Sequence, residues 1–372
     1  MKELIRPELI TMKSYTPIEP IEILEQQAGG RIIKLDGNEN PYGCSPKVYQ
    51  ALSSYPYYHI YPDPEQRELR QALVEYTSLD SQHIVCGSGS DELIDLILRL
   101  FLRPGDEVIN CSPTFGMYPF STEVCGGKVV DVPRDEEFAI DIAGIKKTLN
   151  EKTKVIFVAS PNNPTGNIIT EQEVMELVDT KRVVVVDEAY FAFSNVTVAN
   201  FVTNHPNLIV LRTFSKWAGL AGLRIGYGFF PIKVASYLMK IKPPYNINVA
   251  AQTAVLASLA DIDYLRDNVA KIVAERERLF GKLGELEWLK PYSSSANFIL
   301  CSMIRENAKE IWRQLQNKGI FVRYFDTPRL KDCLRISVGK PEDTDALIEA
   351  LRTLPVIASE AKQSQFGPIS SE

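Results

Sequence analysis

The stretch Arg182-Val183-Val184-Val185-Val186-Asp187 decides how this chain folds. It is an almost purely apolar run that ends at a carboxylate, and residues 154–160 and 208–213 form runs of the same kind. Continuous runs of Val and Ile, without alternating polar residues, are typical of parallel strands that are buried on both faces. From about Ser45 to Ile247 such strands alternate with helical segments, which predicts a doubly wound α/β domain.

Polar side chains follow these runs at the points where the strands end. Asn163 lies in the turn after the first run, Asp187 and Tyr190 follow the second, and Lys216 follows the third. In open α/β sheets, ligands bind beyond the carboxyl ends of the strands. We therefore expect an amide, a carboxylate with a phenol, and an amine to meet in one crevice, and this convergence predicts an enzyme.

Composition argues against several other classes of function. The 372 residues are 45% hydrophobic and carry a formal net charge of −6, so no overall basic field attracts nucleic acid or an anionic membrane. No segment reaches about 18 apolar residues without charges, and the first ten residues do not resemble a signal peptide, so we expect a cytoplasmic protein. The six cysteines and three histidines are scattered, which predicts reduced thiols and no metal site.

The length of the chain accommodates one large domain and one smaller domain. We expect residues 1–40 to form an N-terminal arm that belongs to the small domain, residues 41–248 to form the large cofactor-binding domain, and residues 249–355 to complete the small domain. Residues 356–372 are rich in Ser, Gln, Gly and Glu and show no period, which predicts a disordered tail.

Within the small domain, the pattern predicts one long helix over residues 249–285. It also predicts strands at 297–300 and 334–338 on either side of a helix over 308–318, which is a βαβ-type arrangement.

Lys216 has apolar or small neighbours, Phe214, Trp217 and Ala218. An ammonium group held there is partly desolvated, which lowers its pKa and makes the amine a nucleophile toward an aldehyde. The alternative is a solvated surface lysine. Ser215 and Arg224 lie close enough in sequence to reach a phosphate near the same lysine.

The segment Gly87-Ser88-Gly89-Ser90-Asp91-Glu92 follows a predicted strand and opens a helix. Glycines allow the backbone to approach a ligand, and the free N–H groups at a helix start attract an anion, so we expect a phosphate site here. The alternative is a capping box between Ser88 and Asp91, which needs no ligand.

A lone carboxylate at the end of a buried strand, such as Asp187, is unfavourable unless it is paired. Pairing with a pyridine nitrogen keeps that nitrogen protonated and turns the ring into an electron sink. Tyr190 and Asn163 can then donate to a phenolate oxygen of the same ring, and Phe115 can stack on it. The alternatives are a cap or salt bridge for Asp187, core packing for Tyr190 and Phe115, and turn formation by Asn163 before its proline.

Taken together, these motifs resemble those of fold type I pyridoxal-phosphate-dependent aminotransferases, class II subfamily. The resemblance covers roughly residues 14–352, and its stretches 38–41 (Asn-Glu-Asn-Pro) and 244–246 (Pro-Tyr-Asn) are similar to the histidinol-phosphate branch. The other matching stretches are 34–43, 61–64, 89–92, 160–166, 187–190, 215–224, 296–298 and 334–339.

The resemblance implies an α/β protein of the PLP-dependent transferase fold type I, in which a large domain has a mostly parallel sheet between helices and a smaller domain is α+β. It implies a homodimer that binds pyridoxal 5'-phosphate, with Lys216, Asp187 and Tyr190 as catalytic residues. Lys216 would link to the cofactor and carry the proton, while Asp187 would pair with the ring nitrogen. The remaining cofactor-binding residues would be Gly89, Ser90, Asp91, Phe115, Asn163, Thr213, Ser215 and Arg224, with Tyr61 contributed by the partner subunit.

For substrate binding, the resemblance implies Arg335 at the anionic end of the substrate, together with Tyr15 of the N-terminal arm and Asn38. The implied partners are a phosphorylated amine and a 2-oxo acid: L-histidinol phosphate and 2-oxoglutarate would give imidazole acetol phosphate and L-glutamate in histidine biosynthesis. The open alternatives are a phosphothreonine decarboxylase, a broad-specificity aromatic aminotransferase and a non-catalytic cofactor-sensing regulator.

Overall fold

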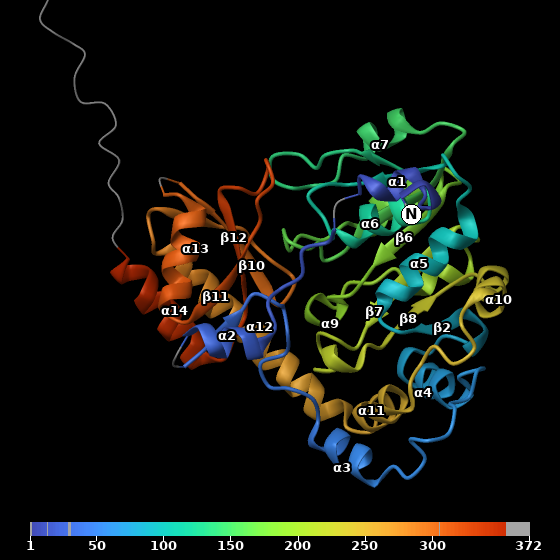
Figure 1. Cartoon of the computed structure of the whole chain (residues 1–372), viewed down its shortest axis with the longest axis horizontal. Coiled ribbons are helices and arrows are strands. Elements are labelled where there is room, and N and C mark those ends of the chain that lie inside the picture. The colour runs from blue at the N-terminus through green and yellow to red at the C-terminus, as the bar shows by residue number, and fades with distance from the viewer. Residues whose placement is uncertain (1, 13, 29–30, 305, 355–372) are drawn as a thin grey trace, which may run out of the picture.

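Two separate β-sheets organise the chain in the computed structural model (Figure 1). The structure describes residues 2–12, 14–28, 31–304 and 306–354, so the predicted tail at 356–372 lies outside the described residues.

The larger sheet has seven strands in the order β2-β8-β7-β6-β5-β3-β4. All neighbouring pairs are parallel except those of β8, which is antiparallel to both β2 and β7. The sheet is therefore mostly parallel, as predicted. The strands are β2 (Ile84–Gly87), β3 (Glu107–Asn110), β4 (Lys128–Asp131), β5 (Thr153–Ala159), β6 (Val183–Asp187), β7 (Leu208–Thr213) and β8 (Gly226–Phe229).

Helices cover both faces of this sheet, and for this reason its central strands are apolar throughout. In β5, Val155 and Phe157 belong to one core, while Ile156 and Val158 belong to the other. The first core is closed by α5 (Ser90–Phe101), α6 (Met117–Val124) and α10 (Ile232–Ile241). The second core is closed by α3 (Pro46–Ser54), α4 (Arg67–Thr77), α7 (Ile142–Thr148), α8 (Glu171–Val178) and α11 (Val249–Leu259), and by part of α12 (Ile262–Gly284).

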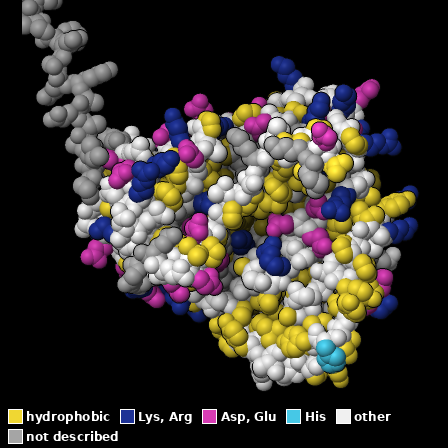
Figure 2. Space-filling view, viewed as in Figure 1, with side chains coloured by type: hydrophobic (Ala, Val, Ile, Leu, Met, Phe, Trp, Pro, Cys, Tyr) yellow, Lys and Arg dark blue, Asp and Glu magenta, His cyan; other side chains and the backbone are white. Residues whose placement is uncertain are grey.

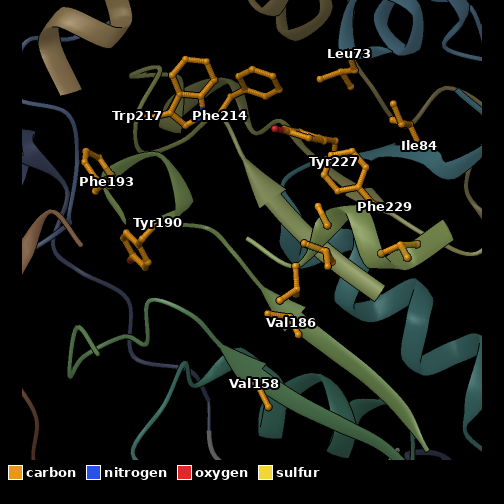
Figure 3. Close-up of a cluster of buried hydrophobic side chains, with 14 of the residues drawn as sticks. Leu73, Ile84, Val158, Val186, Tyr190, Phe193, Phe214, Trp217, Tyr227 and Phe229 are labelled. Carbon is orange, nitrogen blue, oxygen red and sulfur yellow. The ribbon is translucent and has the colours of Figure 1, made fainter. Parts of the chain in front are cut away.

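Figure 3 shows part of the second core, in which Phe214 and Trp217 lie beside Tyr227 and Phe229. The ring centroid of Phe214 is 5.5 Å from that of Trp217 and 5.2 Å from that of Tyr227. Both residues that flank the Ser215-Lys216 pair are thus anchored in the hydrophobic core, which fixes the backbone that carries Lys216.

The smaller sheet has five strands in the order β1-β11-β12-β10-β9 and its own core. Strand β1 (Ile33–Leu35) pairs in parallel with β11 (Ile320–Tyr324), which ties the N-terminal part of the chain to the C-terminal part. The other elements of this part are β9 (Leu289–Pro291), β10 (Phe298–Met303), β12 (Cys333–Ser337), α13 (Ala308–Asn317) and α14 (Pro341–Thr353).

The remaining helices of the described residues are short. Helix α1 (Pro7–Ile10) contacts α6 beside the large sheet. The others are η1 (Lys2–Leu4), α2 (Ile21–Ala28), η2 (Ser81–His83), α9 (Phe191–Ser194), η3 (Ala199–Thr203) and η4 (Ala221–Leu223). None of the helices in the described part of the chain is long and apolar enough to cross a lipid bilayer.

Two predictions about residues 249–338 are wrong. The predicted helix over 249–285 is two helices, because the chain breaks at Ala260–Asp261, where Asp261 is held by the Ser45 hydroxyl (2.5 Å) and by Lys47 (2.8 Å). The βαβ-type arrangement is also wrong. Strand β11, which the sequence analysis overlooked, follows α13, and both β10 and β11 pair with β12 in antiparallel fashion.

Candidate active site

A cavity of about 420 Å³ lies between the two sheets, at the carboxyl ends of β5, β6 and β7. Figure 2 shows a hollow in the middle of the molecule, at which basic and acidic side chains gather. Gly89 and Tyr61 do not line this cavity. The predicted residues that do are Tyr15, Asn38, Ser90, Asp91, Phe115, Asn163, Asp187, Tyr190, Thr213, Ser215, Lys216, Arg224 and Arg335.

Lys216 lines the cavity, and its side chain is not a solvated surface charge. Its Nζ donates to the backbone oxygen of Gly37 at 3.2 Å. Burial lowers the pKa of Lys216 to about 8, and the positive charges of Arg335 and Arg224 act in the same direction. About a tenth of the amine is therefore neutral at pH 7, and the neutral form is the one that acts as a nucleophile or a proton acceptor.

Asp187 is 4% exposed, and its two carboxylate oxygens have different donors. The Tyr118 hydroxyl donates to Oδ2 at 2.7 Å, and the backbone N–H of Ala189 donates to Oδ1 at 3.1 Å. Burial raises the pKa of Asp187 to about 6. Among the described residues, no lysine or arginine forms an ion pair with this carboxylate, so the salt-bridge alternative is wrong.

Tyr190 and Asn38 form one buried pair beside Asp187. The Asn38 amide nitrogen donates to the Tyr190 hydroxyl at 2.9 Å, and the Ser337 hydroxyl donates to Oδ1 of Asn38 at 2.8 Å. The Tyr190 ring packs edge-on against Phe298, with centroids 5.1 Å apart. Packing thus holds the ring of Tyr190 at the wall of the cavity.

Asn163 and Arg335 bring the two sheets together at the cavity wall. Nη1 of Arg335 donates to Oδ1 of Asn163 at 2.6 Å, and Nη2 donates to the backbone oxygen of Asp36. The Nε atom of Arg335 is buried and has no hydrogen-bond partner among the residues that the structure describes. Burial lowers the pKa of Arg335 to about 10, which is still high enough to keep the guanidinium charged at neutral pH. An anion in the cavity would relieve this unpaired buried charge.

The other end of the cavity has the features of an anion site. Helix α5 starts at Ser90 after Gly89, whose φ is +79°, and the first N–H groups of a helix have no partner within it. Arg224 donates from Nη2 to Oδ2 of Asp91 at 2.8 Å. The capping box proposed as the alternative is not formed, because the N–H of Ser88 donates to the Glu92 carboxylate at 2.6 Å and α5 has no side-chain cap.

Thr213 and Ser215 add two hydroxyl groups at the same end of the cavity. The Thr213 hydroxyl donates to the Ser215 hydroxyl at 2.9 Å, so the pair is ordered at the end of β7.

Aromatic side chains border the site. Phe115 lines the cavity, and its ring meets Tyr118 edge-on at 5.6 Å. Tyr15 is 43% exposed and belongs to an arm that Arg323 holds, through donation to the backbone oxygens of Thr16 (2.9 Å) and Pro17 (3.2 Å). Tyr61 is 78% exposed and stacks on Tyr245 at 4.5 Å, outside the cavity of its own chain.

The sequence analysis missed two contributions to this site. The Tyr118 hydroxyl bonds Asp187, and the Ser337 hydroxyl orients Asn38. Phe115 precedes helix α6 and Tyr118 lies in its first turn, so the spacing of these two residues gave no signal for the bond to Asp187. Ser337 gave no signal either, since its role depends on the pairing of distant strands. Among the described residues, no group of three or more His, Cys, Asp or Glu side chains is placed to hold a metal ion.

Comparison with known proteins agrees with this geometry. A sequence profile of the family "Aminotransferase class I and II" matches residues 30–351. The chain is 51% identical over 351 residues to a histidinol-phosphate aminotransferase of Dehalococcoides mccartyi, covering 94% of this chain and 98% of the relative. It is 47% identical to the chloroplastic histidinol-phosphate aminotransferase 1 of Arabidopsis thaliana, covering 94% of this chain and 85% of that protein.

The fold also agrees with a solved structure. The crystal structure of histidinol-phosphate aminotransferase from Sinorhizobium meliloti in complex with pyridoxal-5'-phosphate superposes with a TM-score of 0.84 at 28% identity, covering 94% of this chain and 98% of that one. The mixed α/β sheets described above are thus those of a PLP-dependent aminotransferase fold. The chain belongs to the class I and II aminotransferases and, within them, to the histidinol-phosphate aminotransferase family.

Proposed function

We propose that this chain transfers the amino group of L-histidinol phosphate to 2-oxoglutarate, with pyridoxal 5'-phosphate as its cofactor. The observation that carries the proposal is the pairing, in one cavity, of a lysine whose pKa is lowered to about 8 with a buried carboxylate. Such groups are arranged for proton and carbonyl chemistry at neutral pH. The resulting reaction is a step of histidine biosynthesis in the cytoplasm.

Pyridoxal phosphate fits the side chains of this cavity. Asp187 is a buried carboxylate that lacks a cationic partner among the described residues, and a protonated ring nitrogen supplies one. The Tyr190 hydroxyl and the Asn163 amide are available to the ring oxygen, and Phe115 to a ring face. Ser90, Ser215 and Arg224 would hold the phosphate at the start of α5. When bound, the cofactor supplies an aldehyde that links to amines and a ring that withdraws electrons from the adjacent carbon.

In this proposal, Lys216 is the general base and the general acid. Its neutral Nζ would hold the cofactor through the aldehyde carbon, with water as the leaving group. Once the amine of the substrate displaces it, Nζ would accept the proton from the amino-bearing carbon and later return it. Asp187 stays ionised to hold a positive charge at the ring nitrogen. A single amine can perform both proton transfers because its pKa lies close to the working pH.

Arg335 would bind the anionic end of each substrate in turn. Both the phosphate ester and 2-oxoglutarate carry an anionic group, and the unpaired Nε of Arg335 is the donor that remains for it. Tyr15 and the arm held by Arg323 would cover the substrate on the opposite side. In a homodimer, the exposed Tyr61 would reach the cofactor phosphate of the partner subunit.

The test measures glutamate formed from histidinol phosphate and 2-oxoglutarate by the purified protein and by Lys216→Ala. We expect the variant to lose turnover and still bind the cofactor without a covalent link. Lys290→Ala, an exposed lysine of β9, is the matched control and should keep full activity. Full activity in Lys216→Ala would refute the assignment.

Two further substrates separate this function from its rivals. Release of carbon dioxide from O-phosphothreonine would identify a decarboxylase, and equal rates on phenylalanine and histidinol phosphate would identify a broad aromatic aminotransferase. We expect neither result. A chain that binds the cofactor but turns over no substrate would be a regulator.

A further inference from the structure

We propose that Tyr118 is a positioning residue, which keeps the Asp187 carboxylate ionised and aimed at the cofactor ring. This inference rests on the proposed use of pyridoxal phosphate, and it concerns a residue on α6, an element to which the reaction above assigns no role. The Tyr118 hydroxyl donates to Oδ2 of Asp187 at 2.7 Å, and both residues line the cavity.

Packing fixes the direction of this hydroxyl group. Tyr118 is fully buried, at 0% exposure, and its ring stacks on Phe157 with centroids 4.7 Å apart and an interplanar angle of 4°. Phe115 also contacts the Tyr118 ring, in an edge-on arrangement with centroids 5.6 Å apart. A ring held by two aromatic neighbours retains little rotational freedom, so its hydroxyl is preorganised toward the carboxylate before any ligand binds.

The charges around Asp187 explain why such a donor is needed. Asp91 on α5 and the adjacent Glu188 both disfavour a negative charge on Asp187, although each has an arginine partner, Arg224 and Arg212 respectively. The phenol of Tyr190 lies nearby, and in the part of the chain that the structure describes it forms its hydrogen bond with Asn38 and not with this carboxylate.

Two donors oppose these effects. The Ala189 N–H comes from the same turn as Asp187, so Tyr118 is the donor that a separate helix brings to the carboxylate. Burial raises the pKa of Asp187 to about 6, and donation from Tyr118 lowers it. Without the hydroxyl, Asp187 would take up a proton at a higher pH, and a neutral acid holds a pyridinium nitrogen poorly.

Tyr118 also couples two parts of the proposed cofactor site. Its hydroxyl contacts the carboxylate that would hold the ring nitrogen, and its ring packs against Phe115, which would stack on the face of the cofactor ring. The substitution Tyr118→Phe removes the first contact and keeps the second. It therefore tests the hydroxyl alone.

The experiment titrates cofactor-free protein with pyridoxal phosphate from pH 5 to pH 8 and follows binding by absorbance. For Tyr118→Phe we expect a dissociation constant raised on the order of tenfold at neutral pH, the effect of losing one hydrogen bond to a charged group. We also expect the loss of affinity on acidification to begin at a higher pH than in the unmodified protein. A purely structural role would weaken binding equally at all pH values.

The controls distinguish the effect of losing the Tyr118 hydroxyl from the effect of disturbing the hydrophobic core. Tyr227→Phe removes the hydroxyl of another buried tyrosine, in β8, and should leave the pH dependence unchanged. In an Asp187→Asn background, Tyr118→Phe should have no further effect on affinity. The proposal would be overturned if Tyr118→Phe weakened cofactor binding as much in the Asp187→Asn protein as in the unmodified one. It would also be overturned if the pH at which affinity falls did not change.

A second variant covers the case in which Tyr118→Phe does not fold. Incorporation of 3-fluorotyrosine at position 118 keeps the ring and makes the phenol a stronger donor. The pH at which cofactor affinity falls should therefore be lower than in the unmodified protein. If the pH at which cofactor affinity falls stays the same, the proposal is overturned. These measurements need no turnover, so a failure of the histidinol phosphate assay would refute the proposed substrate and leave this result standing.

Discussion

Arg335 of β12 donates a 2.6 Å hydrogen bond from Nη1 to Oδ1 of Asn163, which follows β5 in the other sheet. The bond orients the Asn163 amide, so its nitrogen is left to donate into the cavity. A hydrogen bond thus joins Arg335, which is proposed to bind the substrate, to Asn163, which is proposed to bind the cofactor ring. If Arg335 binds the substrate as proposed, substrate binding would therefore be coupled to the position of Asn163.

Arg335→Gln should lower kcat/KM for histidinol phosphate on the order of 100-fold, because a charge-assisted contact to phosphate is lost in a buried site. The dissociation constant of the cofactor should change far less. Steady-state kinetics with histidinol phosphate and with unphosphorylated histidinol measure the difference. Arg276→Gln, whose arginine bonds Ala296 and Glu277 away from the cavity, is the control. Equal losses on both substrates would show that Arg335 does not bind the phosphate.

Gly89→Ala should weaken cofactor binding on the order of tenfold or more. Gly89 has a φ of +79°, and a Cβ atom there would lie 2.7 Å from Nη2 of Arg224. The substitution therefore strains the turn and displaces the guanidinium proposed to hold the cofactor phosphate.

Gly105→Ala is a matched control for that experiment. Gly105 has a φ of +86°, and no atom of the described residues lies within 4 Å of a Cβ atom built on it. Both variants carry the backbone strain, and only the first disturbs Arg224. Binding titrations should give a normal dissociation constant for Gly105→Ala, and a similar loss in both variants would assign the effect to strain alone.

The sequence predicted the large sheet well because its signal is local. The runs that became β5, β6 and β7 are apolar on both faces, and each ends at the residue that enters the cavity. The break at Asp261 could not be predicted, because it depends on Ser45 and Lys47, more than two hundred residues earlier in the chain.

The same reasoning explains the outcome for the candidate site. Lys216 and Asp187 follow apolar strands directly, so their convergence could be read from the sequence. The Tyr118 bond to Asp187 joins residues 69 positions apart on different elements, and the Asn38 bond to Ser337 joins residues 299 positions apart. Contacts of this kind form only when the helices and sheets pack together, so no periodic pattern in the sequence predicts them.

Arg212→Met should lower the free energy of unfolding by about 3–5 kcal/mol, because it leaves the buried Glu188 carboxylate without its partner. Glu188 and Arg212 are 2.9 Å apart with side chains 1% and 8% exposed, and Thr197 bonds both. Urea unfolding measures the loss. The double variant Glu188→Leu with Arg212→Met should recover much of it. Breaking the exposed pair Lys146–Glu176 should change stability by less than about 1 kcal/mol, and a similar effect for both pairs would contradict the buried-charge argument.

Lys216→Met should make the cofactor-free protein more stable at pH 7. The pKa of Lys216 is lowered to about 8 from an ordinary 10.5, so below pH 8 the native state must hold a charge that its surroundings disfavour. The shift corresponds to an upper bound of about 3 kcal/mol. Between pH 8 and 10.5 the unfolded chain binds more protons than the native one, so the stability of the unmodified protein rises with pH and the gap to the variant closes. Urea unfolding at pH 7 and pH 10 measures this gap, with Lys290→Met as the exposed control. A gap that is the same at both pH values would mean that the stability difference comes from packing of the methionine and not from the buried charge.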